Sequence, residues 1–321
     1  MPFLSTAVLE PFSLDFVQRA LVGGGLVAIL CGVVGTWVVV RGMAFLGEAL
    51  AHGMLPGVAL ATVLGAPVLV GGALSAVVMS LGVAALQRRG RLSYDTSIGL
   101  LFVAMLALGV VVISHSGSFA TDATSILFGD VLAITSEDLG LLAGATIVGV
   151  GLAAAFHRPL LALALDPRLA AVLGLGPRSA QAVLVGLVTL AVVASYQAVG
   201  SLLVVGLLLA PAVAAGHWTS RLPTRMVLSA VIGVLAVAVG LLDSWHAATA
   251  AGASIAATAI AFAGLSGVGH AAVGRRRERR ERRERRERGA RRGGGRDGRG
   301  ARRGGGGRRA GGDTASCRDV R

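Results

Sequence analysis

The sequence predicts an all-α integral membrane protein, a polytopic bundle of about eight or nine transmembrane helices followed by a disordered Arg/Gly-rich tail. Of the 321 residues, 54% are hydrophobic and only 15% are charged, whereas soluble domains average about 25% charged residues. The formal net charge of +13 comes from the end of the chain, where residues 275–321 hold 20 arginines and 7 acidic residues. We therefore divide the chain into a transmembrane domain, 1–274, and a disordered basic tail, 275–321.

The apolar residues gather in runs of about 20, the length at which a helix crosses a hydrocarbon core of about 30 Å. The predicted spans lie at about 17–40, 45–65, 67–87, 97–114, 138–156, 179–195, 198–216, 226–243 and 247–266. The segment 119–135 is too polar to span, so we expect it to lie at the surface or to re-enter the membrane.

Arginine placement predicts the orientation of these spans, because cytoplasmic loops of membrane proteins collect basic residues. With nine spans and the tail inside, Arg19 is the one arginine on the outer side of the membrane domain. The inner loops hold Arg41, Arg88, Arg89, Arg91, Arg158, Arg168, Arg178, Arg221 and Arg225. We expect the N-terminus outside and the C-terminal tail in the cytoplasm.

The least hydrophobic span contains the stretch RGMAFLGEALAHGMLPG, residues 41–57. Glu48 and His52 are four residues apart, so in a helix they share one face. A carboxylate and an imidazole suit zinc, manganese or iron, and ionisable groups at membrane depth usually face a cavity or a substrate path. The alternative is a Glu–His pair that satisfies itself and only packs helices.

Small residues and prolines accompany this pair. Gly53 and Gly57 begin a series of small residues at every fourth position, which predicts a face where another helix backbone approaches closely. Pro56 removes a backbone hydrogen bond one turn after His52 and should kink the helix. Pro211 should do the same in the seventh span.

The longest inner connection, residues 157–178, offers a surface for another protein. Asp166 is an N-cap candidate with Pro167 at the first helical position, and a short amphipathic stretch follows as far as Gly174. This stretch is either a partner's docking surface or a plain helical connector.

Composition also excludes some kinds of chemistry. The chain has no lysine, and a P-loop requires one, so any ATP use must come from a partner. Cys31 and Cys317 form neither a disulfide framework nor a CxxC metal pair. The RRE triplets and Gly/Arg repeats of the tail offer almost nothing apolar to bury. We expect the tail to attract anionic lipid and do not expect nucleic-acid binding.

Four blocks of sequence carry a resemblance to a known family. RGMAFLGEALAHGMLPGVALA closely resembles the signature of permease subunits of metal ABC importers, the ABC-3 family, which serves zinc, manganese and iron. Three more blocks follow in the family order: DTSIGLLFVAMLALGVVVIS, LFGDVLAIT, and DPRLAAVLGLGPRSAQ leading into VGSLLVVGLLLAPAVAA. The similarity covers roughly residues 15–265.

The resemblance implies a permease of the bacterial cytoplasmic membrane that is a transport subunit and not an enzyme. It implies a homodimer, a separate ATPase subunit, an extracytoplasmic metal-binding protein and no permanently bound cofactor. The cargo would be zinc or manganese first, with iron as a further candidate, and Glu48 and His52 would line its path. The family usually has aspartate where this chain has Glu48, which keeps the charge and lengthens the arm.

The same resemblance implies a coupling helix at about 166–176 that docks on the ATPase. Its contact residues would be Asp166, Pro167, Leu169, Ala170, Leu173 and Gly174.

The sequence fits two rival functions less well. An intramembrane metalloprotease would need an HExxH motif or a comparable zinc triad, and the sequence has one Glu–His pair with neither. An ion-driven secondary metal transporter would work without an ATPase and would be expected to show inverted repeats, of which none is clear.

Overall fold

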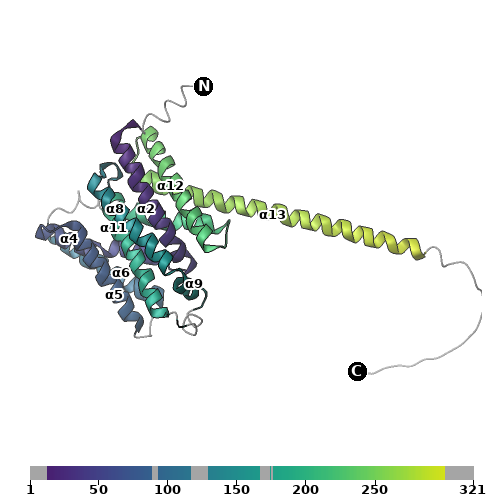
Figure 1. Cartoon of the computed structure of the whole chain (residues 1–321), viewed down its shortest axis with the longest axis horizontal. Helices are drawn as coiled ribbons and strands as arrows, with labels where there is room; N and C mark the ends of the chain where they lie inside the picture. Colours follow the sequence, from purple (N-terminus) through teal and green to yellow (C-terminus); the bar gives the residue numbers. More distant parts are fainter. Residues whose placement is uncertain (1–12, 89–92, 117–128, 167–173, 175, 301–321) are drawn as a thin grey trace, which may run out of the picture. The chain divides into compact units, whose positions relative to one another are not determined.

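The computed structural model describes residues 13–88, 93–116, 129–166, 174 and 176–300 (Figure 1). Within these ranges the chain forms helices and turns and no β-strand, so the predicted all-α fold is confirmed. The elements are α2 Asp15–Val40, α3 Ala44–Gly53, α4 Leu55–Leu64, α5 Val68–Arg88, α6 Tyr94–Ser116, η2 Val131–Ala133, α8 Ser136–Ala155, α9 His157–Leu165, α11 Pro177–Gly216, α12 Leu222–Ala247 and α13 Ala251–Gly300.

In this described part of the chain, nine helical stretches are long and apolar enough to cross a membrane. Their bounds agree with the predicted spans within four residues everywhere except at the end of the ninth. The second span consists of α3 and α4, and the sixth and seventh are the two halves of α11. The predicted polytopic bundle is therefore confirmed, and its described residues provide nine candidate spans.

Helices α2 and α12 pack antiparallel, and this packing defines the two ends of the bundle. A Cβ at Gly24 would meet Val237, whereas one at Gly32, two turns later, would meet Ala230, seven residues earlier in α12. We call the end where α2 begins the Asp15 end and the end where it stops the Arg41 end. Helix α12 accordingly starts at the Arg41 end.

Helix α11 is a hairpin. Its first turns lie at the Arg41 end, where Arg41 Nη2 donates to Gln181 Oε1 (3.3 Å). Its last turns lie there too, because Arg225 in the first turn of α12 donates to the carbonyl of Ala212 (3.1 Å). The reversal is at Gly200, whose φ of 73° and ψ of 166° are essentially accessible only to glycine.

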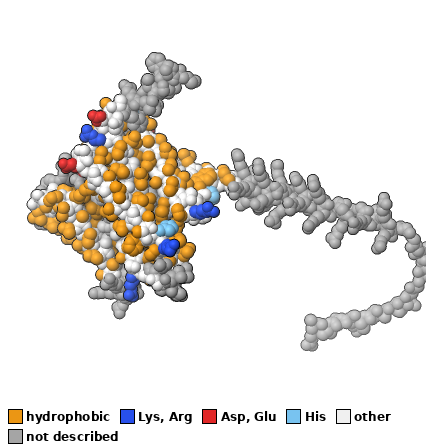
Figure 2. Space-filling model, viewed as in Figure 1, with side chains coloured by type: hydrophobic (Ala, Val, Ile, Leu, Met, Phe, Trp, Pro, Cys, Tyr) orange, Lys and Arg blue, Asp and Glu red, His pale blue; other side chains and the backbone are white. Residues whose placement is uncertain are grey.

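The two ends of the bundle differ in charge. Figure 2 shows acidic side chains on the upper part of one face, and Arg and His side chains without acidic ones on its lower part. By position in the helices, the Asp15 end holds Asp15, Arg19, Asp130, Glu137, Asp138 and Asp243. The Arg41 end holds Arg41, Asp95, Arg158, Asp166, Arg178, Arg221 and Arg225.

The chain divides into two compact units, Met1–Val268 and Gly269–Arg321. Helix α13 continues to Gly300, so residues 275–300, which we expected to be disordered, are helical in the structure. The spacing of the repeat favours helix over the RRE triplets, because Glu278, Glu281 and Glu284 are each followed four residues later by an arginine, a pattern that stabilises helices. The rest of the tail, 301–321, lies outside the described residues.

Candidate functional site

The span that carries Glu48 and His52 begins immediately after α2. The chain turns through Gly42, which has a φ of +66°, and Met43 N–H donates to the carbonyl of Val38 (3.0 Å). Helix α3 then starts at Ala44 and leads away from the Arg41 end. At about 1.5 Å per residue, Glu48 lies about 6 Å and His52 about 12 Å along the helix from Ala44, so both side chains start at membrane depth.

Glu48 and His52 contact each other directly. The Nε2 atom of His52 lies 2.9 Å from Oε1 of Glu48, as the i,i+4 spacing predicts. The His52 side chain remains 22% exposed and the Glu48 side chain 39% exposed. A carboxylate exposed to lipid would be costly, so the uncovered side of this pair must face water or another polypeptide in the assembled protein.

An aromatic side chain of α6 borders the pair. The ring of Phe102 packs edge-on against His52, with a centroid distance of 5.8 Å, and against Phe45, with a centroid distance of 5.6 Å. Sequence reasoning did not single out Phe102, although it lies in the quoted block DTSIGLLFVAMLALGVVVIS. Its place beside an ionisable residue appears only when α3 and α6 are seen packed together.

Small residues fix α3 and α4 against α5. The hydroxyl of Ser75 donates to the carbonyl of Gly53 (2.7 Å), and a Cβ at Gly57 would overlap the backbone of Gly71. Gly65 extends the small-residue spacing in the sequence but has another role: it ends α4 with a φ of +66° and nothing within 4 Å of its would-be Cβ. The packed stripe therefore ends before Gly65.

The two prolines have different surroundings. Helical assignment is interrupted at Met54, and Pro56 lies in the first turn of α4 directly after the interruption. Pro211 lies within the second half of α11, where the dihedral angles stay helical; the departure from helical geometry is at Gly200. A bend caused by Pro211 stays a prediction.

Arg41 links this span to the neighbouring elements. Its Nη1 donates to the carbonyl of Leu163 in α9 (2.6 Å), its Nη2 donates to Gln181 in α11, and Gln181 Nε2 in turn approaches Met43 Sδ (3.6 Å). Sequence reasoning had counted Arg41 only as a loop charge, although it opens the same block that contains Glu48. The turn before α3 is thus tied to α9, the helix that leads into residues 166–176.

Most of the predicted coupling residues cannot be placed, because Pro167, Leu169, Ala170 and Leu173 lie outside the described residues. Asp166 follows α9 in an extended conformation and donates its N–H to Ala162 (3.1 Å). Gly174 has a φ of +68°. Helix α9 was not predicted as a separate helix.

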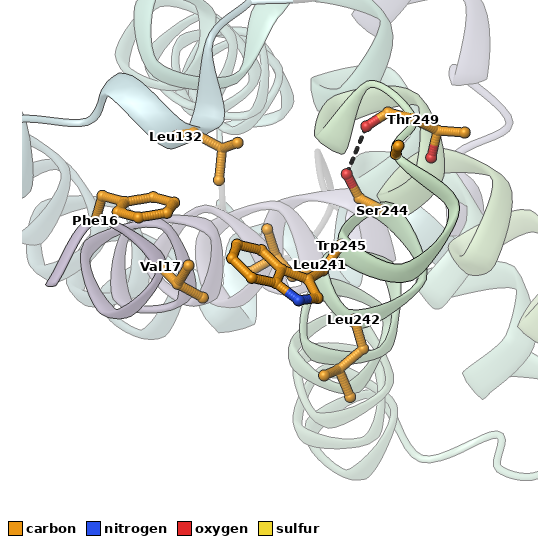
Figure 3. Close-up of a pocket in the computed structure, with 9 residues that line it drawn as sticks. Phe16, Val17, Leu132, Leu241, Leu242, Ser244, Trp245 and Thr249 are labelled. Carbon is orange, nitrogen blue, oxygen red and sulfur yellow. Dashed lines mark hydrogen bonds between the residues drawn. The ribbon is translucent and has the colours of Figure 1, made fainter. Parts of the chain in front are cut away.

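The remaining polar side chains do not extend the pair into a larger cluster. Among the described residues, no group of three or more His, Cys, Asp and Glu could hold a metal ion. A separate depression of about 220 Å³ lies at the Asp15 end, between the start of α2, η2 and the end of α12. Figure 3 shows Phe16 and Trp245 around it, with Ser244 Oγ donating to the carbonyl of Thr249 (2.6 Å).

Known proteins resemble this chain over most of its length. The model of the ABC 3 transport family matches residues 13–267. The manganese transport system membrane protein MntC of Halalkalibacterium halodurans is 37% identical over 243 residues, which are 76% of this chain and 83% of the relative. The chelated iron transport system membrane protein YfeD of Yersinia pestis is 32% identical over 260 residues, which are 79% of this chain and 86% of the relative. The solved structure of PsaBC from Streptococcus pneumoniae in complex with Fab has a TM-score of 0.72 and 31% identity, and covers 82% of this chain and 95% of its own.

Proposed function

The chain belongs to the ABC 3 transport family, and on this basis we propose that it is the permease subunit of an ATP-driven importer of divalent manganese. Its work is transport and not catalysis, and ATP hydrolysis belongs to a partner. The absence of lysine from the sequence agrees with this division, because a P-loop needs its lysine.

The observation that carries the proposal is the half-buried Glu48–His52 pair in the second span. His52 Nε2 lies 2.9 Å from Glu48 Oε1, and both side chains are partly uncovered at membrane depth. A hydrated cation that enters an apolar bundle loses solvation, and a carboxylate oxygen with an imidazole nitrogen can replace part of it. Two protein ligands, with water or the second copy of the chain completing the shell, would hold the ion weakly enough to release it, unlike a closed four-ligand site.

The hydrogen bond between the two side chains implies a step in ion binding. An ionised Glu48 only accepts, and in that state His52 Nε2 carries the proton in the contact. A metal ion needs the lone pair of that nitrogen, so binding through Nε2 requires its proton to leave or the ring to change tautomer. Ion binding through this nitrogen is therefore coupled to movement of its proton, either to Nδ1 or off the ring.

Manganese is proposed as the cargo for two reasons. The relatives include a manganese transport membrane protein at 37% identity, and carboxylate oxygen with imidazole suits Mn²⁺. A relative named for chelated iron makes iron the main competitor, and zinc remains compatible with the same two ligands. The metal specificity is therefore part of the test.

We assign the Arg41 end to the cytoplasm because its loops hold the basic residues. The ATPase would dock there, on residues 166–176, and the extracytoplasmic metal-binding protein would dock at the Asp15 end. A second copy of the chain would cover the open side of Glu48. The N-terminus would then be outside and the tail inside.

The direct test is metal uptake by a bacterial strain that lacks its own manganese importers and expresses this chain with its ATPase and metal-binding protein. Radioactive manganese should accumulate only when the ATPase can hydrolyse ATP, and excess iron or zinc should compete less well than unlabelled manganese. Uptake with an inactive ATPase would favour the ion-driven secondary transporter. Stronger competition by iron or zinc would correct the proposed metal.

Docking is tested separately from transport. Replacing Leu169 and Leu173 with glutamate should abolish co-purification of the ATPase while membrane insertion stays intact. Unchanged co-purification would remove the coupling role from residues 166–176.

A further inference from the structure

An apolar groove of about 870 Å³ lies between α2, α8 and α12. Its lining is hydrophobic except for His157, which packs edge-on against Trp37 with a centroid distance of 5.4 Å. No residue of α3 or α4 lines the groove, so it is separate from the Glu48–His52 pair. The manganese proposal does not use it.

The groove has the depth of one membrane leaflet. Along α12 its lining extends from Pro223, in the first turn at the Arg41 end, to Leu235. At about 1.5 Å per residue these twelve steps cover about 18 Å, close to half of a hydrocarbon core of about 30 Å. A groove of this depth, open at the surface of a membrane bundle, fits the acyl chain of a phospholipid.

Two arginines flank the groove's lining residues in the sequence at the Arg41 end. Arg158 directly follows the lining residue His157, and Arg221 precedes the lining residue Pro223 by two positions; both arginines are exposed. Figure 2 shows Arg and His side chains on the lower part of the face, with a largely hydrophobic surface above them. Basic residues at the membrane surface attract anionic headgroups.

We propose that this groove binds an anionic phospholipid, with an acyl chain along α12 and the phosphate at Arg158 and Arg221. The charge also argues against a second copy of the chain as the occupant. A two-fold interface places the same patch of both subunits face to face, so the arginines of the two copies would meet and repel each other. A lipid phosphate neutralises them instead.

Native mass spectrometry of the purified full-length chain tests the proposal with phosphatidylglycerol and phosphatidylethanolamine as probes. The wild-type chain should retain phosphatidylglycerol in preference to phosphatidylethanolamine. The Arg158→Gln/Arg221→Gln variant should show a preference lower than that of the wild type by about fivefold per arginine, because the share contributed by the basic tail is the same in both chains. Arg178→Gln, which removes an exposed arginine not adjacent to a lining residue, is the charge control and should behave like the wild type.

A second pair of variants tests the groove itself. Val231→Trp fills it at a position that is 49% exposed, and Val239→Trp adds the same bulk at a 42% exposed position of α12 that does not line it. Val231→Trp should lose both lipids relative to Val239→Trp. If Val231→Trp does not fold, the arginine variants decide alone, because their changes lie on exposed side chains.

Three outcomes would overturn the proposal. If the wild type and the double arginine variant prefer phosphatidylglycerol over phosphatidylethanolamine to the same degree, the two arginines do not contact the headgroup. Equal lipid retention by Val231→Trp and Val239→Trp would show that lipid binds elsewhere. Loss of a dimer in Val231→Trp, with the lipid count unchanged, would make the groove a contact between copies.

Discussion

Helix α2 and the α3–α4 span use the same packing device but leave different surfaces uncovered. In α2, a Cβ at Gly35 would overlap the carbonyl of Leu208 in α11, and no acidic, basic or histidine residue lies between Arg19 and Arg41. In α4, Gly57 packs as closely against α5, yet one face of the span, in α3, keeps the partly exposed carboxylate of Glu48.

This difference suggests a division of roles, with α2 stabilising the bundle and the α3–α4 span contacting the ion. Helix α2 is surrounded by α8, α11 and α12, so its small residues hold the bundle together. The α3–α4 span packs against α5, α6 and α11 as well, but the side that carries Glu48 stays partly uncovered, and we propose that this side is left for the ion. If this is correct, mutations in α2 should remove the protein, whereas mutations of the Glu48–His52 pair should remove its activity.

The largest effect is expected for Gly35→Val. Its Cβ would overlap the backbone of Leu208, and backbone cannot move aside as a flexible side chain can. Overpacking typically costs about 1–3 kcal/mol or more, a large part of a total stability of about 5–15 kcal/mol. Folded, monodisperse protein after detergent extraction should fall to a small fraction of the wild-type yield.

The matched control is Gly25→Ala in the same helix, where a Cβ would have nothing within 4 Å. This variant should be obtained at the wild-type yield and melt at the wild-type temperature. A well-folded Gly35→Val variant would show that α2 and α11 are not packed as tightly as the structure indicates. It would then be wrong that the small residues of α2 hold the bundle together.

The next effect is expected for Glu48→Gln and His52→Ala. Removing one of two ligands should raise the barrier to ion passage, and each 1.36 kcal/mol lowers the rate tenfold. Manganese uptake per assembled complex should therefore fall at least about tenfold in each variant. Assembly should survive, because Glu48→Gln removes a charge and His52→Ala removes a polar ring from a partly uncovered surface.

The opposite pattern is as informative. If the pair only packs helices, the variants would assemble poorly and the assembled fraction would transport at the wild-type rate. Uptake normalised to the amount of intact complex separates these cases, and normal rates in both variants would remove the pair from the ion path.

The comparison also shows what could be read from the sequence. The nine spans could be predicted because apolar runs of about 20 residues report directly on membrane crossing. The contact between Glu48 and His52 could be predicted because i,i+4 spacing in a helix fixes it locally. Both inferences depend on one segment at a time.

The missed features depend on contacts between distant segments. Phe102 lies beside His52 because α6 packs on α3, and Arg41 reaches Leu163, which is 122 residues away. Glycine spacing alone did not show that Gly65 ends a helix while Gly57 packs against Gly71. The helical part of the tail was missed because its low hydrophobicity outweighed its regular Glu–Arg spacing.

A smaller effect is expected for Arg41→Gln, which tests whether the two helices communicate through their junction. The change removes the bonds to Leu163 and Gln181 and leaves α2 and the Glu48–His52 pair intact. Hydrogen bonds to charged groups contribute about 1.5–3 kcal/mol each, so the turn should loosen without unfolding the bundle. Manganese imported per ATP hydrolysed should fall several-fold, while the ATPase still co-purifies.

Arg19→Gln is the control for this variant, because Arg19 is exposed at the other end of α2. Its ratio of uptake to hydrolysis should equal that of the wild type. An unchanged ratio in Arg41→Gln as well would mean that the junction only positions α9 and does not transmit motion.

The smallest effect on uptake is expected for truncation after Gly274, which leaves every residue of α2, α3 and α4 in place. If α2 and the α3–α4 span account for transport, manganese uptake by the truncated chain should stay within about twofold of the wild type, since removing surface charge alters few contacts of the folded bundle.

The tail nevertheless carries the net charge of +13, and each basic residue near an anionic membrane surface contributes about 1 kcal/mol of attraction. Binding of the purified chain to phosphatidylglycerol vesicles should therefore weaken on truncation, and the difference from wild type should shrink as salt rises. A truncated chain that assembles but does not transport would show that the tail takes part in the cycle, and the contrast between α2 and the α3–α4 span would then be incomplete.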